Sequence, residues 1–360
     1  MKHSKLGFLM SILVILSFVL ASCTAPATPE PQTPAEAPSA PESPAAASDD
    51  LKVAILLPGS ANDQSWNQLG YEAIQYVGKE LGVEVAYSEN VGNTDSPDAL
   101  RDYASKGYNV IFGHGGQYEE AMLIVGPEFP DVTFIAVAGA KGGGTNVVAT
   151  DTAPWQYGYA YGWMAGKMSK TNRVGFITAL EGMQTMNNLV GGWRAGVKAA
   201  NPGATACVVY LKDMNDVAAG REAALAMVAD GADVIQHELN AASQGVIDVA
   251  KEKKIWTIGR NFEQVKGAPD AVMTIALFDW GPKFVQLAKD AAAGKLEPGF
   301  FAFGYHTETP GFTYSYDETH AWNPAIPQDL IDQMDKEVGD MFRSDPFMSF
   351  TVEDAKGGCE

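Results

Sequence analysis

Short β-branched runs alternate with stretches of helical hydrophobic spacing along most of the chain. The first run, Val53–Leu57, precedes apolar positions three and four residues apart from Trp66 to Leu81, and a second run follows at Val83–Tyr87. This order predicts a strand, a helix and a parallel strand. The alternation continues with a helix opening at Ser96-Pro97, a strand at Val110–Phe112, a helix over Tyr118–Val125 and a strand at Val132–Ala138. The first part of the chain therefore forms one parallel sheet flanked by helices.

The same rhythm restarts after the glycine run at 142–144. It predicts strands at Val174–Thr178, Thr205–Tyr210, Val234–His237 and Ile255–Gly259, with helices at about 186–200, 217–230 and 244–253. Later segments predict a strand at Val272–Ala276, a helix over about Pro282–Ala293, strand-like runs at 300–304 and 312–316, and a helix near 327–342. We therefore predict an α/β protein of two doubly wound, parallel-sheet lobes joined by a hinge that the chain crosses several times.

The lobe boundaries follow from this pattern. We expect residues 51–151 and about 278–318 to form the N-terminal lobe, and residues 152–277 and about 319–356 to form the C-terminal lobe. Ligands of open parallel sheets bind beyond the carboxyl ends of the strands. Two facing lobes would hold a small molecule between these ends and close upon it by a hinge motion.

The N-terminal segment indicates export. An apolar run of fifteen residues follows Lys2, His3 and Lys5 and ends in Leu20-Ala21-Ser22-Cys23. It is shorter than the roughly 20 residues that a membrane-spanning helix needs, and it has the basic start and small final residues of a signal peptide. The last four residues resemble the bacterial lipobox, which implies cleavage after residue 22 and a lipid anchor on Cys23. An ordinary secretory signal is the alternative.

Residues 24–50 contain seven prolines and eight alanines and no aromatic or large aliphatic side chain. Such a composition predicts a disordered, semi-extended tether. The expected location is therefore extracytoplasmic, with the folded part held near the cell membrane by the lipid on Cys23, in a periplasm or on an outer face.

Charge and cysteine content narrow the range of functions. Cleavage would leave 23 basic against 44 acidic residues, a formal charge of −21, which disfavours nucleic acid as a partner. Of the three cysteines, Cys207 lies in an apolar run that predicts a buried strand, and Cys359 lies in a glycine-rich tail. We therefore expect no disulfide framework.

The segment after the first strand, residues 61–67, contains Asp63-Gln64-Ser65-Trp66-Asn67. It resembles the Asp-x-Ser-Phe-Asn signature of the basic membrane protein (BMP) family, the purine nucleoside-binding lipoproteins of ABC importers, with Trp66 in place of phenylalanine. Further matches, in order, are Phe129–Phe134, Lys170–Phe176, Gly192–Gly196, Asn201-Pro202-Gly203, Gly231–Ile235 and Ile258–Asn261. The resemblance runs from about residue 52 to 290. It implies a type I periplasmic-binding-protein fold and partners that are an ABC permease and ATPase.

The resemblance also implies binding residues. Asp63 and Asn67, with Asn62 beside them, are expected at the cleft, and Trp66 is expected to stack on a ligand ring. His114 and Gly115 follow the Val110–Phe112 strand among glycines, where the imidazole has the chemistry for a ligand hydrogen bond; simple turn chemistry is the alternative.

Three departures from the family bear on the ligand. Ala138-Gly139-Ala140 stands where the family usually has a carboxylate, and Met214 stands where it has a second stacking aromatic. Asn261 and, approximately, Leu277 stand where an aspartate and a lysine of the family hold ribose hydroxyls. We therefore expect a free nucleobase or similar compact heteroaromatic ligand rather than a nucleoside, with Met214 covering a ring face.

Other polar residues follow strands of the second lobe. Glu238, Asn240, Asn261 and Asp279 are candidates for the cleft, and Trp155 and Tyr157 for its rim. Helix capping or packing between the lobes is the alternative for each.

No catalytic site emerges from the sequence. The segment beginning His237-Glu238 lacks the second histidine of a zinc-protease motif, and nucleophile-elbow and phosphate-loop motifs are absent. We therefore predict a non-enzymatic protein without metal or cofactor, which captures a purine-like solute for an ABC importer. A sugar- or furanose-binding protein, a ligand-sensing module for a membrane receptor and a lipid-anchored hydrolase are the alternatives.

Overall fold

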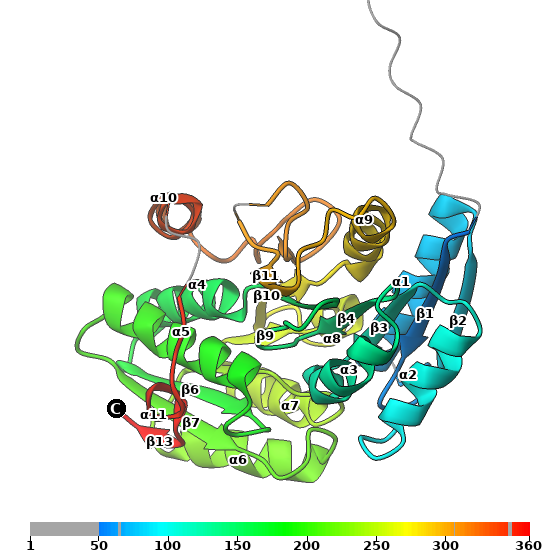
Figure 1. Cartoon of the computed structure of the whole chain (residues 1–360). Helices are drawn as coiled ribbons and strands as arrows, with labels where there is room; N and C mark the ends of the chain where they lie inside the picture. The colour runs from blue at the N-terminus through cyan, green and yellow to red at the C-terminus, as the bar shows by residue number, and fades with distance from the viewer. Residues whose placement is uncertain (1–49, 64–65, 306, 345–347) are drawn as a thin grey trace, which may run out of the picture. The chain divides into compact units, whose positions relative to one another are not determined.

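The computed structural model describes residues 50–360 except 64–65, 306 and 345–347 (Figure 1). The predicted signal peptide, Cys23 and all of the tether but Asp50 lie outside the described residues. Within the described part of the chain, none of the helices has both the length and the apolar character that crossing a bilayer requires.

A six-stranded sheet in the order β11-β5-β4-β3-β1-β2 forms within the described chain, and all its neighbouring strands are parallel. Its strands are β1 (Lys52–Leu56), β2 (Glu84–Ser88), β3 (Val110–His114), β4 (Thr133–Val137), β5 (Val147–Asp151) and β11 (Gly299–Ala302). Helices α1 (Trp66–Leu81) and α9 (Trp280–Ala292) cover one face, and α2 (Ser96–Ser105) and α3 (Glu119–Val125) cover the other. Because both faces are covered, β1 is apolar along its length: Val53 and Ile55 face α1, and Ala54 and Leu56 face α2. Two single 3₁₀ turns flank α3, at Gly116–Tyr118 and Gly126–Glu128.

The second set of strands forms two sheets that a single bridge between Val234 and Trp256 connects. One sheet has the order β13-β7-β6-β8 and the other β12-β10-β9. The strands are β6 (Arg173–Thr178), β7 (Thr205–Tyr210), β8 (Val234–His237), β9 (Thr257–Gly259), β10 (Val272–Leu277), β12 (Thr313–Ser315) and β13 (Gly358–Cys359). The helices are α4 (Pro154–Met168), α5 (Gln184–Ala200), α6 (Val217–Ala229), α7 (Ser243–Lys253), α8 (Phe262–Gly267), α10 (Gln328–Ser344) and α11 (Val352–Ala355).

The predicted α/β architecture is confirmed, and the strands predicted from sequence all form. The sequence pattern missed β5, which follows the glycine run at 142–144 and ends at Asp151. Of the segment 278–318, assigned to the first lobe, α9 packs on α1 and β11 pairs with β5, whereas β12 pairs with β10 of the second set.

Helices α4 and α5 approach so closely that glycine is required at their contact. A Cβ atom on Gly158 or Gly162 of α4 would collide with a carbonyl oxygen of α5, and one on Gly192 or Gly196 would collide with a carbonyl oxygen of α4. These four glycines form the α4–α5 seam. Because the backbones touch directly, the seam fixes the position of the first turn of each helix.

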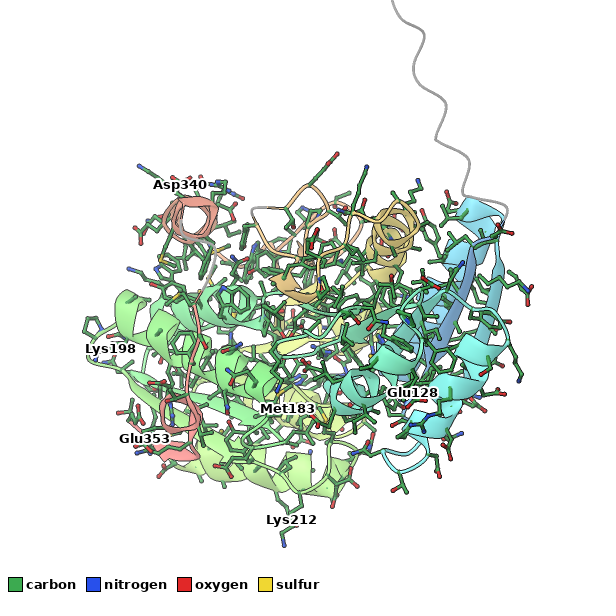
Figure 2. All side chains as sticks on the ribbon, viewed as in Figure 1. Glu128, Met183, Lys198, Lys212, Asp340 and Glu353 are labelled. Carbon is green, nitrogen blue, oxygen red and sulfur yellow. A yellow bond between two sulfur atoms is a disulfide. The ribbon has the colours of Figure 1, made fainter. Side chains whose placement is uncertain are left out.

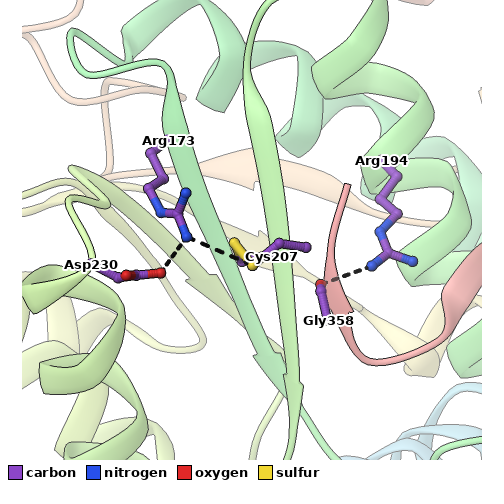
Figure 3. Close-up of a disulfide and its surroundings, with 6 residues drawn as sticks. Arg173, Arg194, Cys207, Asp230 and Gly358 are labelled. Atoms are coloured by element: carbon purple, nitrogen blue, oxygen red, sulfur yellow. Dashed lines mark hydrogen bonds and ion pairs between the residues drawn. A yellow bond between two sulfur atoms is a disulfide. The ribbon is translucent and has the colours of Figure 1, made fainter.

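The expectation of no disulfide is wrong. Cys207 of β7 and Cys359 of β13 are bonded, across a sequence separation of 152 residues (Figure 3). The apolar strand around Cys207 and the glycine-rich tail around Cys359 gave no indication that the tail returns to this strand. β13 pairs antiparallel with the edge of β7. The buried Arg194 donates a hydrogen bond to the carbonyl oxygen of Gly358 at 3.0 Å (Figure 3) and another to that of Asp354 at 3.1 Å.

We predict that Cys359→Ser lowers the free energy of unfolding by about 2–4 kcal/mol, because the bond closes a long loop and restricts the unfolded chain. Denaturant unfolding monitored by circular dichroism measures the loss. A thiol reductant should bring the unmutated protein to the stability of the variant and leave the variant unchanged. Equal stabilities without reductant would contradict a stabilising role.

Candidate functional site

A cavity of about 390 Å³ lies at the carboxyl ends of strands from both sets. Its lining from the first sheet follows β1, β3, β4 and β5, and its lining from the second set follows β6, β7, β8, β9 and β10. The residues, in that order, are Pro58, Gly59, Gly115, Gly116, Gln117, Ala138, Asp151, Thr152, Leu180, Met183, Met214, Asn215, Glu238, Asn240, Arg260 and Phe278, joined by Trp66, Asn67, Tyr157, Thr185 and Met186 from helices. This is the place at which open parallel sheets bind ligands.

Trp66, the first residue of α1, forms part of the cavity wall and is held on one side by His114. The two rings stack with their centroids 4.0 Å apart and their planes 16° apart. Trp66 Nε1 donates a hydrogen bond to the His114 carbonyl oxygen at 2.9 Å, and His114 Nε2 lies 2.9 Å from the Trp66 carbonyl oxygen. The edge of the indole meets Trp280 of α9. The orientation of the indole is thus fixed by contacts on its face, its edge and its nitrogen.

His114 itself is fully buried and, among the described residues, is not part of the cavity wall. Its burial lowers the pKa to about 3, so the imidazole is neutral at physiological pH. A neutral ring whose Nε2 faces a carbonyl oxygen carries its proton on that nitrogen. The structure therefore places His114 behind Trp66, where it supports the indole instead of reaching the cavity.

Gly70 makes this arrangement sterically possible. It lies one turn along α1 from Trp66, and a Cβ atom there would stand 2.5 Å from the His114 ring. The helix therefore reaches the imidazole only because residue 70 has no side chain.

The segment around Trp66 is organised by hydrogen bonds at the start of α1. Asp63 accepts bonds from the backbone nitrogens of Asn67 and Gln68, and Asn67 Nδ2 donates to the same carboxylate at 2.7 Å. The Asn67 Oδ1 atom accepts from Gly59 N at 2.9 Å. Asn67 thus reaches the cavity wall, whereas Asp63 positions the helix and Asn62 is exposed.

The predicted residues of the second set divide into two groups. Met214, Glu238 and Asn240 line the cavity, as Gly115 does in the first sheet. Asn261 and Asp279 are helix caps: Asn261 accepts from Gln264 N at 3.0 Å, and Asp279 accepts from Gly281 N at 3.2 Å. Neither of the two is among the described residues that line the cavity. Of the two rim candidates, Tyr157 lines the cavity and Trp155 lies in the core.

Of the charged groups of the wall, the sequence predicted Glu238 but not Arg260 or Asp151. Arg260 Nη1 forms a 2.6 Å ion pair with Glu238 Oε2, and both are largely buried. Asp151 is 6 % exposed and accepts from Thr185 Oγ1 and Thr152 N, each at 2.7 Å. Burial raises the pKa of Asp151 to about 6, against the lowering effect of these two bonds and of a hydrogen bond from the Thr152 side chain. Burial also raises the pKa of Glu238.

The apolar part of the wall was also only partly predicted. Phe278 follows β10 and supplies an aromatic ring, over which the Arg260 guanidinium lies at 5.4 Å. Met183, labelled in Figure 2, and Met186 lie at the start of α5 and add flexible thioether side chains. Phe278 directly follows β10, which is a sequence signal for the cavity, whereas Met183 and Met186 lie further from the end of β6 and have no such signal.

The described residues contain no group of three or more histidine, cysteine, aspartate or glutamate side chains arranged to hold a metal ion. His237, which begins the protease-like fragment, is fully buried in β8, and burial lowers its pKa to about 3.

Comparison with known sequences gives a consistent result. The family model Bmp, described as ABC transporter substrate-binding protein PnrA-like, matches residues 50–338. The chain is 28% identical to a purine-binding protein of Brucella abortus over 254 residues, which cover 69% of this chain and 71% of the relative. It is 27% identical to the transcriptional activator protein Med of Bacillus subtilis, with coverage of 79% and 86%. It is 29% identical to basic membrane protein A2 of Borrelia garinii, with coverage of 64% and 69%.

Solved structures show the same fold. A transcriptional activator of the comK gene from Bacillus halodurans superposes with a TM-score of 0.68 at 21% identity, covering 82% of this chain and 99% of its own. An ABC transporter solute-binding protein from Conexibacter woesei gives a TM-score of 0.64 at 25% identity, with coverage of 84% and 99%. The predicted type I periplasmic-binding-protein fold is thereby confirmed.

We predict that Gly70→Ala destabilises the protein by about 1–3 kcal/mol, because the added methyl group displaces the His114 ring that supports Trp66. Thermal or denaturant unfolding measures the change. Gln75→Ala, at an exposed position of the same helix, is the control and should shift stability by less than about 0.5 kcal/mol. A stabilised Gly70→Ala variant, the ordinary result of replacing glycine in a helix, would contradict the close approach.

Proposed function

The chain belongs to the Bmp family of ABC transporter substrate-binding proteins, and we propose that it captures a purine-like ligand, a nucleobase in preference to a nucleoside. The family is extracytoplasmic and serves ABC importers, so the partners are a small molecule and the permease and ATPase components.

The observation that carries the proposal is the supported indole in the cavity wall. Because His114 covers one face of Trp66, the opposite face is available to a flat ring in the cavity. Stacking of a base on an aromatic side chain contributes roughly 1–3 kcal/mol. Met214 and Phe278, which also line the cavity, are candidates for the second face of the ring. The Brucella abortus relative named as a purine-binding protein supports the same ligand class.

The preference for a free base rests on the positions where the family holds ribose. The side-chain oxygen of Asn261 accepts the hydrogen bond that caps α8. Leu277 is apolar and is not among the described residues that line the cavity. At these two positions a ribose would therefore lack the charged partners that its hydroxyl groups have in the family.

Binding would be coupled to closure of the lobes. The cavity takes its walls from the loops of both sets of strands, so a ligand between them contacts both sides and stabilises the arrangement in which the walls are close. A permease that recognises this arrangement would distinguish loaded from empty protein.

The anchor is proposed from the sequence alone. The Leu20-Ala21-Ser22-Cys23 segment would be processed so that Cys23 becomes the lipidated first residue of the mature chain. Mass spectrometry of the mature N-terminal peptide tests this, since acylation adds the mass of the lipid to Cys23 and simple secretion does not.

A sugar is the second candidate ligand. The chain is 25% identical over 273 residues to a putative ABC transporter glucose-binding protein of Haloferax volcanii. Aromatic rings and carboxylates line the cavity, and these groups also suit a sugar ring and its hydroxyl groups. Glucose therefore belongs in every titration beside the purines.

We predict that calorimetric titration of the purified protein gives tighter binding of adenine or guanine than of adenosine or guanosine. The reason is the missing partners for ribose. Tighter binding of the nucleosides would reject the nucleobase assignment. If glucose binds and none of the purines does, the protein is a sugar-binding protein.

We predict that Trp66→Ala weakens binding of the preferred purine at least about tenfold, equivalent to roughly 1.4 kcal/mol, because the stacking surface is lost. Trp66→Phe should retain most of the affinity, since it keeps a ring. Phe262→Ala, at an exposed aromatic residue outside the cavity wall, is the control. If the Trp66→Ala variant binds with unchanged affinity, the indole does not contact the ligand.

A further inference from the structure

The cavity wall has more negatively than positively charged side chains. Arg260 pairs with Glu238 at 2.6 Å and neutralises it. Asp151 has no ion-pair partner among the described residues; its hydrogen-bond donors are uncharged, namely the Thr185 hydroxyl group and the backbone nitrogen and side chain of Thr152. The wall therefore carries two carboxylates against one guanidinium, and the excess negative charge belongs to Asp151.

Asp151 has unused capacity to accept hydrogen bonds. Its Oδ1 atom accepts from Thr152 N and its Oδ2 atom from Thr185 Oγ1, and the Thr152 side chain is a further donor to the carboxylate. An ionised carboxylate has about four acceptor positions, so about one is left. Burial of a carboxylate without its full set of donors is unfavourable, which agrees with the raised pKa. A donor that enters the cavity would relieve this cost.

We propose that the cavity selects ligands with an amino-bearing edge, and that Asp151 is the residue that accepts the hydrogen bonds of that edge. The inference rests on the proposed function and narrows its ligand class to neutral or cationic amino-substituted heteroaromatic bases. Phosphorylated and other anionic ligands are rejected, because the uncompensated carboxylate repels them within a poorly solvated wall. Asp151 thus takes the role of the carboxylate that is replaced by Ala138-Gly139-Ala140 after β4.

The location of Asp151 links recognition to the lobes. It is the last residue of β5 in the first sheet, and α4 of the second set begins three residues later at Pro154. Its Thr185 partner lies in the first turn of α5. A ligand bound to this carboxylate therefore contacts the point at which the chain passes from the first sheet to the second set of elements.

Two matched ligand pairs test the selection. Guanine differs from hypoxanthine, and adenine from unsubstituted purine, by one amino group. We expect the amino-bearing member of at least one pair to bind about tenfold more tightly, the effect of one hydrogen bond to a charged acceptor, and we expect nucleoside monophosphates not to bind. Equal affinity within both pairs would overturn the inference and leave the proposed function intact. Failure of every purine to bind would overturn the proposed function itself.

Asp151→Asn tests the residue. The amide keeps the shape and removes the charge, so the preference for the amino-bearing base should fall to less than about threefold. Asp131→Asn, at an exposed turn, is the control for loss of one negative charge and should keep the preference. Circular dichroism and binding of hypoxanthine or unsubstituted purine show that the variant is folded. A folded variant with unchanged preference would overturn the assignment of Asp151.

The pH dependence supplies an independent measurement. As the pH falls from 7.5 to 5, the Asp151 carboxylate with its pKa of about 6 gains a proton and loses acceptor capacity, so affinity for the amino-bearing base should fall by about tenfold. Glu238, Arg260 and Tyr157 are the other ionisable groups near it, and they are unchanged in Asp151→Asn. The affinity of the Asp151→Asn variant should not change over this pH range. If its affinity falls as steeply as that of the unmutated protein, another group is responsible for the pH dependence.

Discussion

The direct backbone contact between α4 and α5 determines the geometry of the cavity. At the α4–α5 seam, Gly158, Gly162, Gly192 and Gly196 bring the two helices together without intervening side chains. The helices begin at Pro154 and Gln184, immediately after residues that line the cavity. A contact of backbone on backbone has little freedom to slide, so the beginnings of both helices are held in register and Thr185 stays within hydrogen-bonding distance of Asp151.

Support for the cavity comes from residues behind it as much as from residues in it. His114 orients Trp66, Asp63 holds Asn67, and Asn261 fixes the start of α8 directly after Arg260. These three side chains are polar and lie next to the cavity wall, and each satisfies a backbone or side-chain group of its neighbour. A binding surface that is preorganised in this way loses less conformational freedom when a ligand enters.

The sequence predicted the sheets better than the cavity wall, for physical reasons. Hydrophobic periodicity reports which face of an element is buried, and it located most strands; it cannot report which of two adjacent polar residues points to a cavity. The sequence analysis predicted Asn261 as a cavity residue, but Asn261 caps α8 and its neighbour Arg260 lines the wall. Asp151 was missed because β5 was missed, after a glycine run that suggested a loop. The Cys207–Cys359 bond depends on a contact across 152 residues, which no local pattern encodes.

The disulfide also bears on how the second sheet is completed during biosynthesis. β7 emerges from the ribosome and crosses the membrane long before β13, so its outer edge has exposed amide and carbonyl groups during that interval. Such an edge is a template for pairing with other chains. The covalent bond, which an oxidising compartment permits, holds the tail on this edge, where β13 pairs with Cys207 and Val208, and that part of the edge stays open to pairing with other chains until the tail has docked.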